Sequence, residues 1–520
     1  MIFRVRPAIE FLFGERARFA TAVVAISLVA FGLRLYWALE LQPPGEAIFS
    51  DMRSYIFRAV WLLCDLQEVS ETRKLDVALF PWGVHYYYAF QMWLFGLADS
   101  GLADQMQSRM AGLDMTAMAV VQASISSLAA TFSMLAARRC FSSLLGAVIV
   151  GAAAALWYPQ ITYSGYFTSE APFSCAVALS LWLWIRYAQT GRGAWAAGLS
   201  QAVGFTLRPK MLMTSLLCLA WLVVRQRRLD HFRWRHLAWI SIPIALVVAF
   251  SVFRYHHFTG EVALISGNAP IGRFFAATDY GHIEADNNRS FYPPARTSVL
   301  GCKGVFRFEG YIADAEKLDP ERRSVWRSKS FFEKLSTVRR NIIALAYGNR
   351  MWPEYNWKSY AGSFAEKKRA WELQRENAPR KHRPAEIELA GSRAERRMEE
   401  EQWWRPLLAN GWRRVAPSIL LPLAALGMAL LARRFKPGLE LASLYVATLL
   451  YASAMYFGEI RYRIPYDPVL ILLGTFPLLT ALRKKRWSVD QDRWVRYTVL
   501  ALLAVVAIMV LVPFDSIAAP

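Results

Sequence analysis

The sequence predicts an all-α polytopic membrane protein with an extracytoplasmic soluble domain. Its 520 residues are 55% hydrophobic, and the apolar residues gather in blocks of about 17–23, close to the ~20 that a helix needs to cross hydrocarbon. The formal net charge is +21. Much of this charge lies in segments between apolar blocks, where it sets orientation, so we expect no nucleic-acid partner.

Basic segments indicate which side of the membrane is cytoplasmic. Four arginines precede the first apolar block, and the short segments 225–236, 433–436 and 483–496 are also basic. The segment 40–80 carries seven acids and four bases and is expected outside. We therefore predict an integral protein of the cell (inner) membrane with a cytoplasmic N-terminus, whose first apolar block is retained as a helix.

The apolar blocks predict about 11 transmembrane helices. Clear spans are expected at 19–39, 115–137, 171–187, 237–253, 415–432, 439–457, 464–482 and 496–513. Four weaker segments are 82–98, 144–158, 195–207 and 211–224. An odd number of crossings must separate the outer loop 40–80 from the basic loop 225–236, so at least one weak segment is expected not to cross.

These spans divide the chain into three parts. Residues 1–253 form an N-terminal transmembrane catalytic module with the first outer loop 40–80, residues 254–411 an extracytoplasmic loop domain, and residues 412–520 the C-terminal transmembrane helices. In the loop domain the first half is expected to be irregular and the stretch 384–404 helical. The five cysteines are scattered, so no disulfide framework or metal site follows from them.

Asp51 is the first candidate functional residue. It follows the first apolar block by a few residues, in a segment that also carries Arg53, Tyr55 and Arg58. Ionisable groups near membrane depth are costly and usually face a cavity or a partner. The structural alternative is that Asp51 caps a surface helix.

Further ionisable residues are expected on the same outer face. Glu170 precedes an apolar block, Arg208-Pro209-Lys210 interrupts another, and Glu459–Asp467 holds Arg461 and Arg463 at the mouth of the block 464–482. Each has a structural alternative: Glu170 as a helix cap, Arg208 and Lys210 as snorkelling side chains, and the two later arginines as interfacial anchors. His85, beside three tyrosines, is first interpreted as a packed or interfacial histidine.

Five short motifs occur in a fixed order along the chain. They are Ser50-Asp51-Met-Arg-Ser-Tyr55, Phe80-Pro-Trp-Gly83 with Leu94-Phe-Gly96, Thr168-Ser169-Glu170, Leu207-Arg-Pro209 and Arg461-Tyr-Arg-Ile-Pro465. This order resembles the glycosyltransferase-C superfamily, especially its protein-mannosyltransferase-like and aminoarabinose-transferase-like branch. The resemblance covers about 19–225 and 440–482 and leaves the loop 254–411 without a match.

The resemblance implies transfer of a sugar from a polyprenyl-phosphate donor to a lipid, glycan or protein acceptor on the extracytoplasmic face. A carboxylate can take the acceptor's proton, so Asp51 is expected as the general base of an inverting displacement. Cations are expected to hold the donor phosphate; the candidates are Arg461, Arg463, Arg208 and Lys210. Candidates for sugar or acceptor binding are Glu170, Tyr55, Arg53, Glu459 and His85.

No cofactor is expected. Many relatives have Asp-Glu at the catalytic position, whereas this chain has Asp51-Met52. The role that the family gives the second acid, including metal binding, therefore has no matching residue here.

Two other classes of function stay open at the level of sequence. A transporter or flippase of lipid-linked saccharides would use the same cations without breaking a bond, although the chain lacks two matching halves with Gly/Pro-broken helices. A non-catalytic scaffold would use the loop 254–411 to bind partners.

Overall fold

The computed structural model describes residues 14–42, 44, 50–63, 81–97, 114–229, 231–260, 262–265, 273, 276–277, 320, 322–347, 404–431, 436–456 and 460–483. This part of the chain forms helices and contains no strand, as the apolar blocks predict. The predicted span 496–513 and the predicted helix 384–404, apart from its last residue Trp404, lie outside the described residues.

Six helical segments are long and apolar enough to cross a membrane. They are α2 (Glu15–Tyr36) with its continuation η2 (Trp37–Leu41), α7 (Thr116–Phe141), α10 (Glu170–Thr190), α13 (Trp234–Thr259), α23 (Pro437–Met455), and α24 (Ile460–Arg463) with η8 (Ile464–Tyr466) and α25 (Asp467–Arg483). They confirm that the chain is a membrane protein. The count of about 11 spans stays a prediction.

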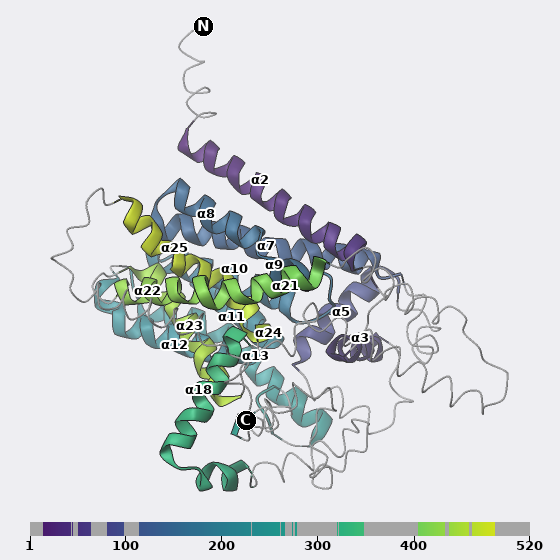
Figure 1. Ribbon diagram of the computed structural model, residues 1–520. Coiled ribbons are helices and arrows are strands. Elements are labelled where there is room, and N and C mark those ends of the chain that lie inside the picture. The colour runs from purple at the N-terminus through teal and green to yellow at the C-terminus, as the bar shows by residue number, and fades with distance from the viewer. Residues whose placement is uncertain are drawn as a thin grey trace, which may run out of the picture.

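Shorter helices fill the spaces between these six. They are α8 (Leu144–Ala155), α9 (Tyr158–Tyr163), α11 (Ala194–Leu207), α12 (Lys210–Arg225), α21 (Trp404–Val415), η7 (Ala416–Leu420) and α22 (Leu421–Leu431). Helices α11 and α12 form a hairpin whose tip is Arg208-Pro209. In Figure 1, α21 and α22 follow one another along one side of the bundle.

Two helices precede the main bundle in sequence. Helix α3 (Ser50–Leu63) lies inside the predicted outer loop 40–80, and α5 (Trp82–Leu94) packs on it. The 13 residues of α5 extend for only ~20 Å, whereas the hydrocarbon core is ~30 Å thick. The hydroxyls of Tyr87 and Tyr88 on α5 donate to Gln122 of α7 and to the carbonyl oxygen of Thr168, just before α10. Because α8 and α11 are about equally short, which weak segment does not cross stays a prediction.

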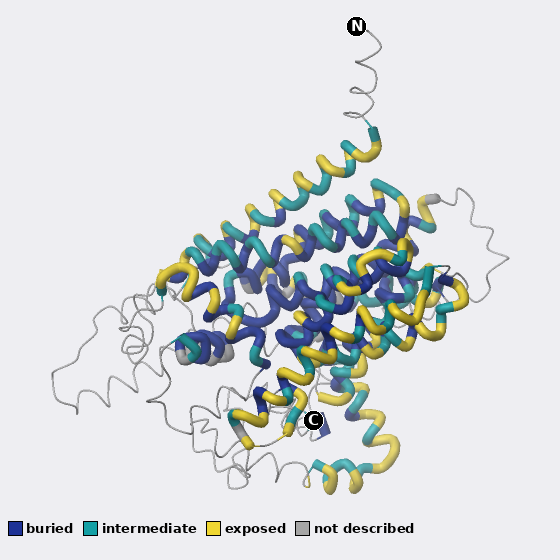
Figure 2. The backbone as a smooth tube through the Cα atoms, turned by 180° about the vertical axis from the view of Figure 1, so that it is seen from behind, coloured by how far each residue is buried: buried dark blue, intermediate teal, exposed yellow. Residues whose placement is uncertain are grey.

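The most deeply buried of the six spans is Ile460–Leu482. In the segment Ile460–Leu482, 83% of the most apolar window is buried inside the protein, against 22% for Glu15–Leu41. Figure 2 shows the same difference, with α2 largely exposed along the edge of a buried interior. Apolar side chains on α2 such as Leu28 are exposed and therefore available to lipid.

One helix of the predicted loop domain is joined to the bundle. Helix α18 (Phe331–Tyr347) contacts α23 and α24. The guanidinium of Arg463 donates to the backbone carbonyl oxygens of Leu345 and Ala346, over 3.0 and 3.3 Å. The domain boundaries at 253 and 411 stay predictions.

Candidate functional site

A buried carboxylate joins three of the sequence motifs. Glu170 is the first residue of α10, and its side chain is fully buried. Its Oε1 accepts hydrogen bonds from Arg208 Nη2 and from Arg461 Nε, and both arginines are buried as well. Residues that are far apart in sequence thus meet at one ion-pair network.

The local conformation of Arg208 follows from the proline after it. A residue that precedes proline is pushed into extended backbone, and Arg208 has φ −148° and ψ 123°. This conformation ends α11 and turns the chain into α12. The Arg208 Nε also donates to the Ser169 hydroxyl over 3.0 Å. The Arg-Pro motif and the Ser-Glu motif are therefore in direct contact.

Lys210 completes this group of charges. Its ammonium donates to the carbonyl oxygen of Tyr462 over 3.0 Å and lies 4.6 Å from the centre of the Tyr466 ring. We call Glu170, Arg208, Lys210 and Arg461 the Glu170 cluster. It holds three basic side chains and one carboxylate, so it carries excess positive charge.

Arg463 belongs to a different group. Its Nε donates to Asp467 Oδ1 over 2.9 Å, one helical turn further on, and only 1% of its side chain is exposed. The other Asp467 oxygen accepts from the Trp157 indole over 2.7 Å. The structure thus separates two arginines that the sequence grouped together. The i, i+4 spacing of Arg463 and Asp467 is the feature of the sequence from which this ion pair could have been predicted.

A second group of buried polar residues lies where α3, α5 and α13 meet. Tyr55 and Arg58 of α3, His85 of α5 and Arg254 of α13 are each 5% exposed or less. The rings of Tyr55 and His85 have their centres 5.9 Å apart. We call these four residues the His85 cluster.

His85 has an unusual environment. Among the described residues neither of its ring nitrogens has a hydrogen-bond partner. Burial first, and then the charges of Arg58 and Arg254, hold the pKa of His85 well below its ordinary value, so the imidazole is neutral. Sequence reasoning gave Arg254 no role, and its only sequence signal was a cation directly after the apolar block 237–253.

The two clusters are connected through α5. The Tyr88 hydroxyl donates to the backbone carbonyl oxygen of Thr168 over 2.9 Å, two residues before Glu170. Gly83 brings α5 close to α11 at Thr206, two residues before Arg208. The Pro-Trp-Gly motif therefore packs the helix that carries His85 against the hairpin that carries Arg208.

Asp51 is the second residue of α3. Positions 51, 55 and 58 lie on one face of a helix, and Tyr55 and Arg58 on this face are buried in the His85 cluster. The side chains of Asp51 and Arg53, and the whole of Glu459, lie outside the described residues.

Met52 occupies the position where many relatives carry a second acid. It is 3% exposed and belongs to the same buried apolar cluster as Trp37, Tyr158, Ile460 and Ile464. The surroundings are apolar, which explains why a methionine suits this position. The same cluster holds the start of α3 and α24 together in one part of the molecule.

One protein-family model matches this chain. It describes the dolichyl-phosphate-mannose-protein mannosyltransferases and covers residues 105–255, which include Glu170, Arg208, Lys210 and Arg254; Asp51 and Arg461 lie outside it. No curated protein matches the chain. The match confirms the predicted resemblance to the glycosyltransferase-C superfamily, and it supports a membrane glycosyltransferase that uses a lipid-linked sugar donor.

Proposed function

We propose that this chain transfers a sugar from a polyprenyl-phosphate donor to an acceptor on the extracytoplasmic face of the cell membrane. The observation that carries the proposal is that α3, which begins at Ser50-Asp51, is packed into the same end of the bundle as the Glu170 cluster. We therefore assign the acid, the buried cations and the family-matched segment to one site. Lipid, glycan and protein acceptors all offer a hydroxyl or similar nucleophile to it.

The chemistry assigned to Asp51 is that of a general base. Its carboxylate takes the proton of the acceptor hydroxyl as the acceptor oxygen bonds to the anomeric carbon. The bond from that carbon to the phosphate oxygen breaks, and its electron pair leaves with the polyprenyl phosphate. A single direct displacement inverts the anomeric configuration and needs no second carboxylate as a nucleophile. Metal independence is part of this proposal.

The leaving phosphate needs fixed positive charge. In the Glu170 cluster, Arg208, Lys210 and Arg461 outnumber the single carboxylate, and we assign the phosphate to this excess charge. Glu170 then has the role of holding Arg208 and Arg461 in place. Arg463 is neutralised by Asp467 and supports the structure around it.

The His85 cluster offers further contacts on the donor side. Arg58 lies two turns after Asp51 on the same face of α3, and Arg254 brings a second positive charge from α13. A neutral imidazole at His85 can still donate one hydrogen bond and accept another. We assign Tyr55 and His85 to the sugar, with the two arginines contributing to the field at the phosphate.

Transfer assays with purified, reconstituted protein and radiolabelled polyprenyl-phosphate sugar test the base. Asp51→Asn should fold normally and lose about 10²–10⁴ in rate. Asp114→Asn is the matched control, because Asp114 is exposed and its carboxylate accepts the Thr116 backbone N–H. Asn keeps that capping ability, so the control should transfer at the wild-type rate.

Activity of Asp51→Asn within a few-fold of wild type would remove Asp51 as the base and favour a helix-cap role. Movement of intact donor across a vesicle membrane, with no sugar transferred to any acceptor, would instead favour a transporter.

A further inference from the structure

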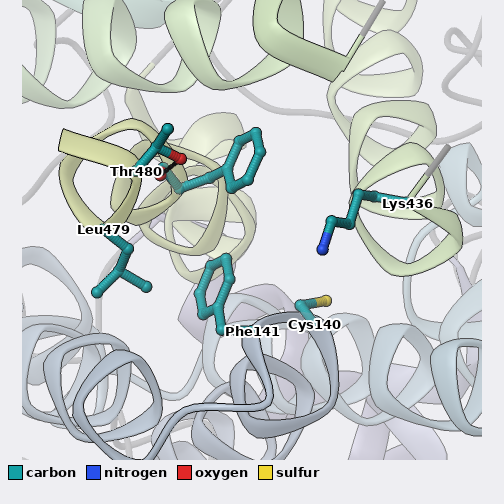
Figure 3. A pocket seen from close by; sticks show the side chains of 6 residues that line it. Cys140, Phe141, Lys436, Leu479 and Thr480 are labelled. Carbon is teal, nitrogen blue, oxygen red and sulfur yellow. Dashed lines mark hydrogen bonds between the residues drawn. The ribbon is translucent and has the colours of Figure 1, made fainter. Parts of the chain in front are cut away.

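A cavity lies at the end of the bundle away from the Glu170 cluster (Figure 3). It is small, with a volume of about 40 Å³, and is open on one side. Three helices form it, at the end of α7, the start of α23 and the end of α25. Its walls are made by Cys140, Phe141, Lys436, Phe476, Leu479 and Thr480.

The surrounding end of the bundle is strongly basic. Arg138 and Arg139 end α7. In sequence, Arg433 and Arg434 come just before Lys436, and Arg483-Lys-Lys-Arg486 follows Thr480 by a few positions. In sequence, basic segments thus adjoin both α23 and α25. An anionic ligand would be attracted to this end of the molecule.

Lys436 is placed where an anion would stabilise it. It is the residue before the first turn of α23, and a cation there opposes the positive end of the helix dipole. Figure 3 shows its ammonium directed into the cavity. Within the described part of the chain no carboxylate is paired with it. The acid in that first turn, Glu440, is engaged by Trp221 and Arg225 of α12 over 2.8 and 3.1 Å.

Apart from Thr480 and Cys140, the other side chains of the cavity wall are apolar. Phe141 and Phe476 stack with their ring centres 6.5 Å apart, and Leu479 lies beside them. A fully water-soluble anion would satisfy Lys436 but would gain nothing from these side chains. A ligand with both an anionic group and hydrocarbon fits the whole cavity.

We propose that this cavity binds the headgroup phosphate of an anionic phospholipid, taken from the leaflet that faces the basic end of the bundle. Basic pockets between transmembrane helices on the cytoplasmic side bind such headgroups in other membrane proteins. The small cavity admits the phosphate, with the rest of the headgroup and the acyl chains lying outside along the lipid-facing surface. Lys436 and the start of α23 hold the phosphate, and the phenylalanines contact the glycerol region.

Thermal unfolding of the purified full-length protein in neutral detergent tests the proposal. Phosphatidylglycerol should raise the unfolding temperature, because a ligand that binds only the folded state stabilises it. Phosphatidylcholine and glycerol phosphate should have little effect. Lys436→Gln should weaken the apparent affinity for phosphatidylglycerol at least tenfold, and Lys436→Arg should restore it.

Arg192→Gln is the matched control, since Arg192 is exposed in the short turn between α10 and α11, at the same end of the bundle, and does not line the cavity. It should respond to phosphatidylglycerol as wild type does. If Lys436→Gln is less stable than wild type without lipid, binding is measured directly instead, as the phosphatidylglycerol that the protein retains in native mass spectra. An equal response or retention in Lys436→Gln and wild type would overturn the proposal, as would equal stabilisation by glycerol phosphate.

Discussion

Gly83 of α5 lies directly against Thr206 of α11. A Cβ built on Gly83 would be 2.7 Å from the backbone carbonyl carbon of Thr206, closer than two non-bonded carbons can approach. Both residues are buried. The glycine of the Pro-Trp-Gly motif therefore sets how closely α5, with His85, approaches the hairpin that carries Arg208.

Gly83→Ala should displace α5 from α11. We expect a loss of roughly 1–3 kcal/mol of stability, as for other overpacked sites, together with a lower transfer rate, because His85 and Tyr88 move with the helix. Gly32→Ala is the control, since a Cβ at Gly32 meets nothing within 4 Å. In thermal unfolding of the purified variants, Gly32→Ala should melt at the wild-type temperature or slightly above it. If the two variants had the same melting temperature and the same transfer rate, the packing of α5 on α11 at Gly83 would not be close.

Glu170→Gln should be strongly destabilising. It removes the charge that Arg208 and Arg461 share, and breaking a buried ion pair costs about 3–5 kcal/mol. Glu15→Gln removes the acid of an exposed pair with Arg138 and should cost at most about 1 kcal/mol. Measuring the melting temperatures of the two purified variants compares their losses of stability. If Glu170→Gln melts as Glu15→Gln does, the carboxylate does not hold the two arginines.

Arg463 and Asp467 should be replaceable as a pair. Arg463→Met alone leaves the buried carboxylate of Asp467 with the Trp157 indole as its one partner among the described residues, and it should lower the melting temperature markedly. The double variant Arg463→Met/Asp467→Leu should recover much of that loss, because an apolar pair removes both buried charges. Its affinity for the lipid-linked donor, measured by titration, should match wild type. A large loss of donor affinity in the folded double variant would return Arg463 to the phosphate site.

Cysteine labelling tests the orientation of the bundle. Ser324→Cys, at an exposed position before α18, should react with a membrane-impermeant maleimide in intact cells. Gln226→Cys, in the basic loop 225–236, should react only after lysis. Wild-type protein gives the background of the five native cysteines. The reverse pattern would place the Glu170 cluster on the cytoplasmic face and contradict an extracytoplasmic active site.

The sequence by itself determined the class of protein and much of its local structure. Apolar blocks of spanning length specify membrane helices because an unpaired backbone group in hydrocarbon is too costly. Proline at 209 specifies where α11 ends, through the steric restriction on Arg208. The order of the short motifs was enough to predict a resemblance to the superfamily, and the match over 105–255 confirmed that resemblance.

Only the tertiary structure decided which charges share a site. Glu170 and Arg461 are 291 positions apart, and no local rule predicts such a contact. Arg461 and Arg463 look equivalent in sequence, yet two positions along a helix turn them about 200° apart, so one meets Glu170 and the other meets Asp467. The packing of α5 on α11 likewise depends on the space left by a missing side chain at Gly83, which becomes visible only once the two helices are placed together.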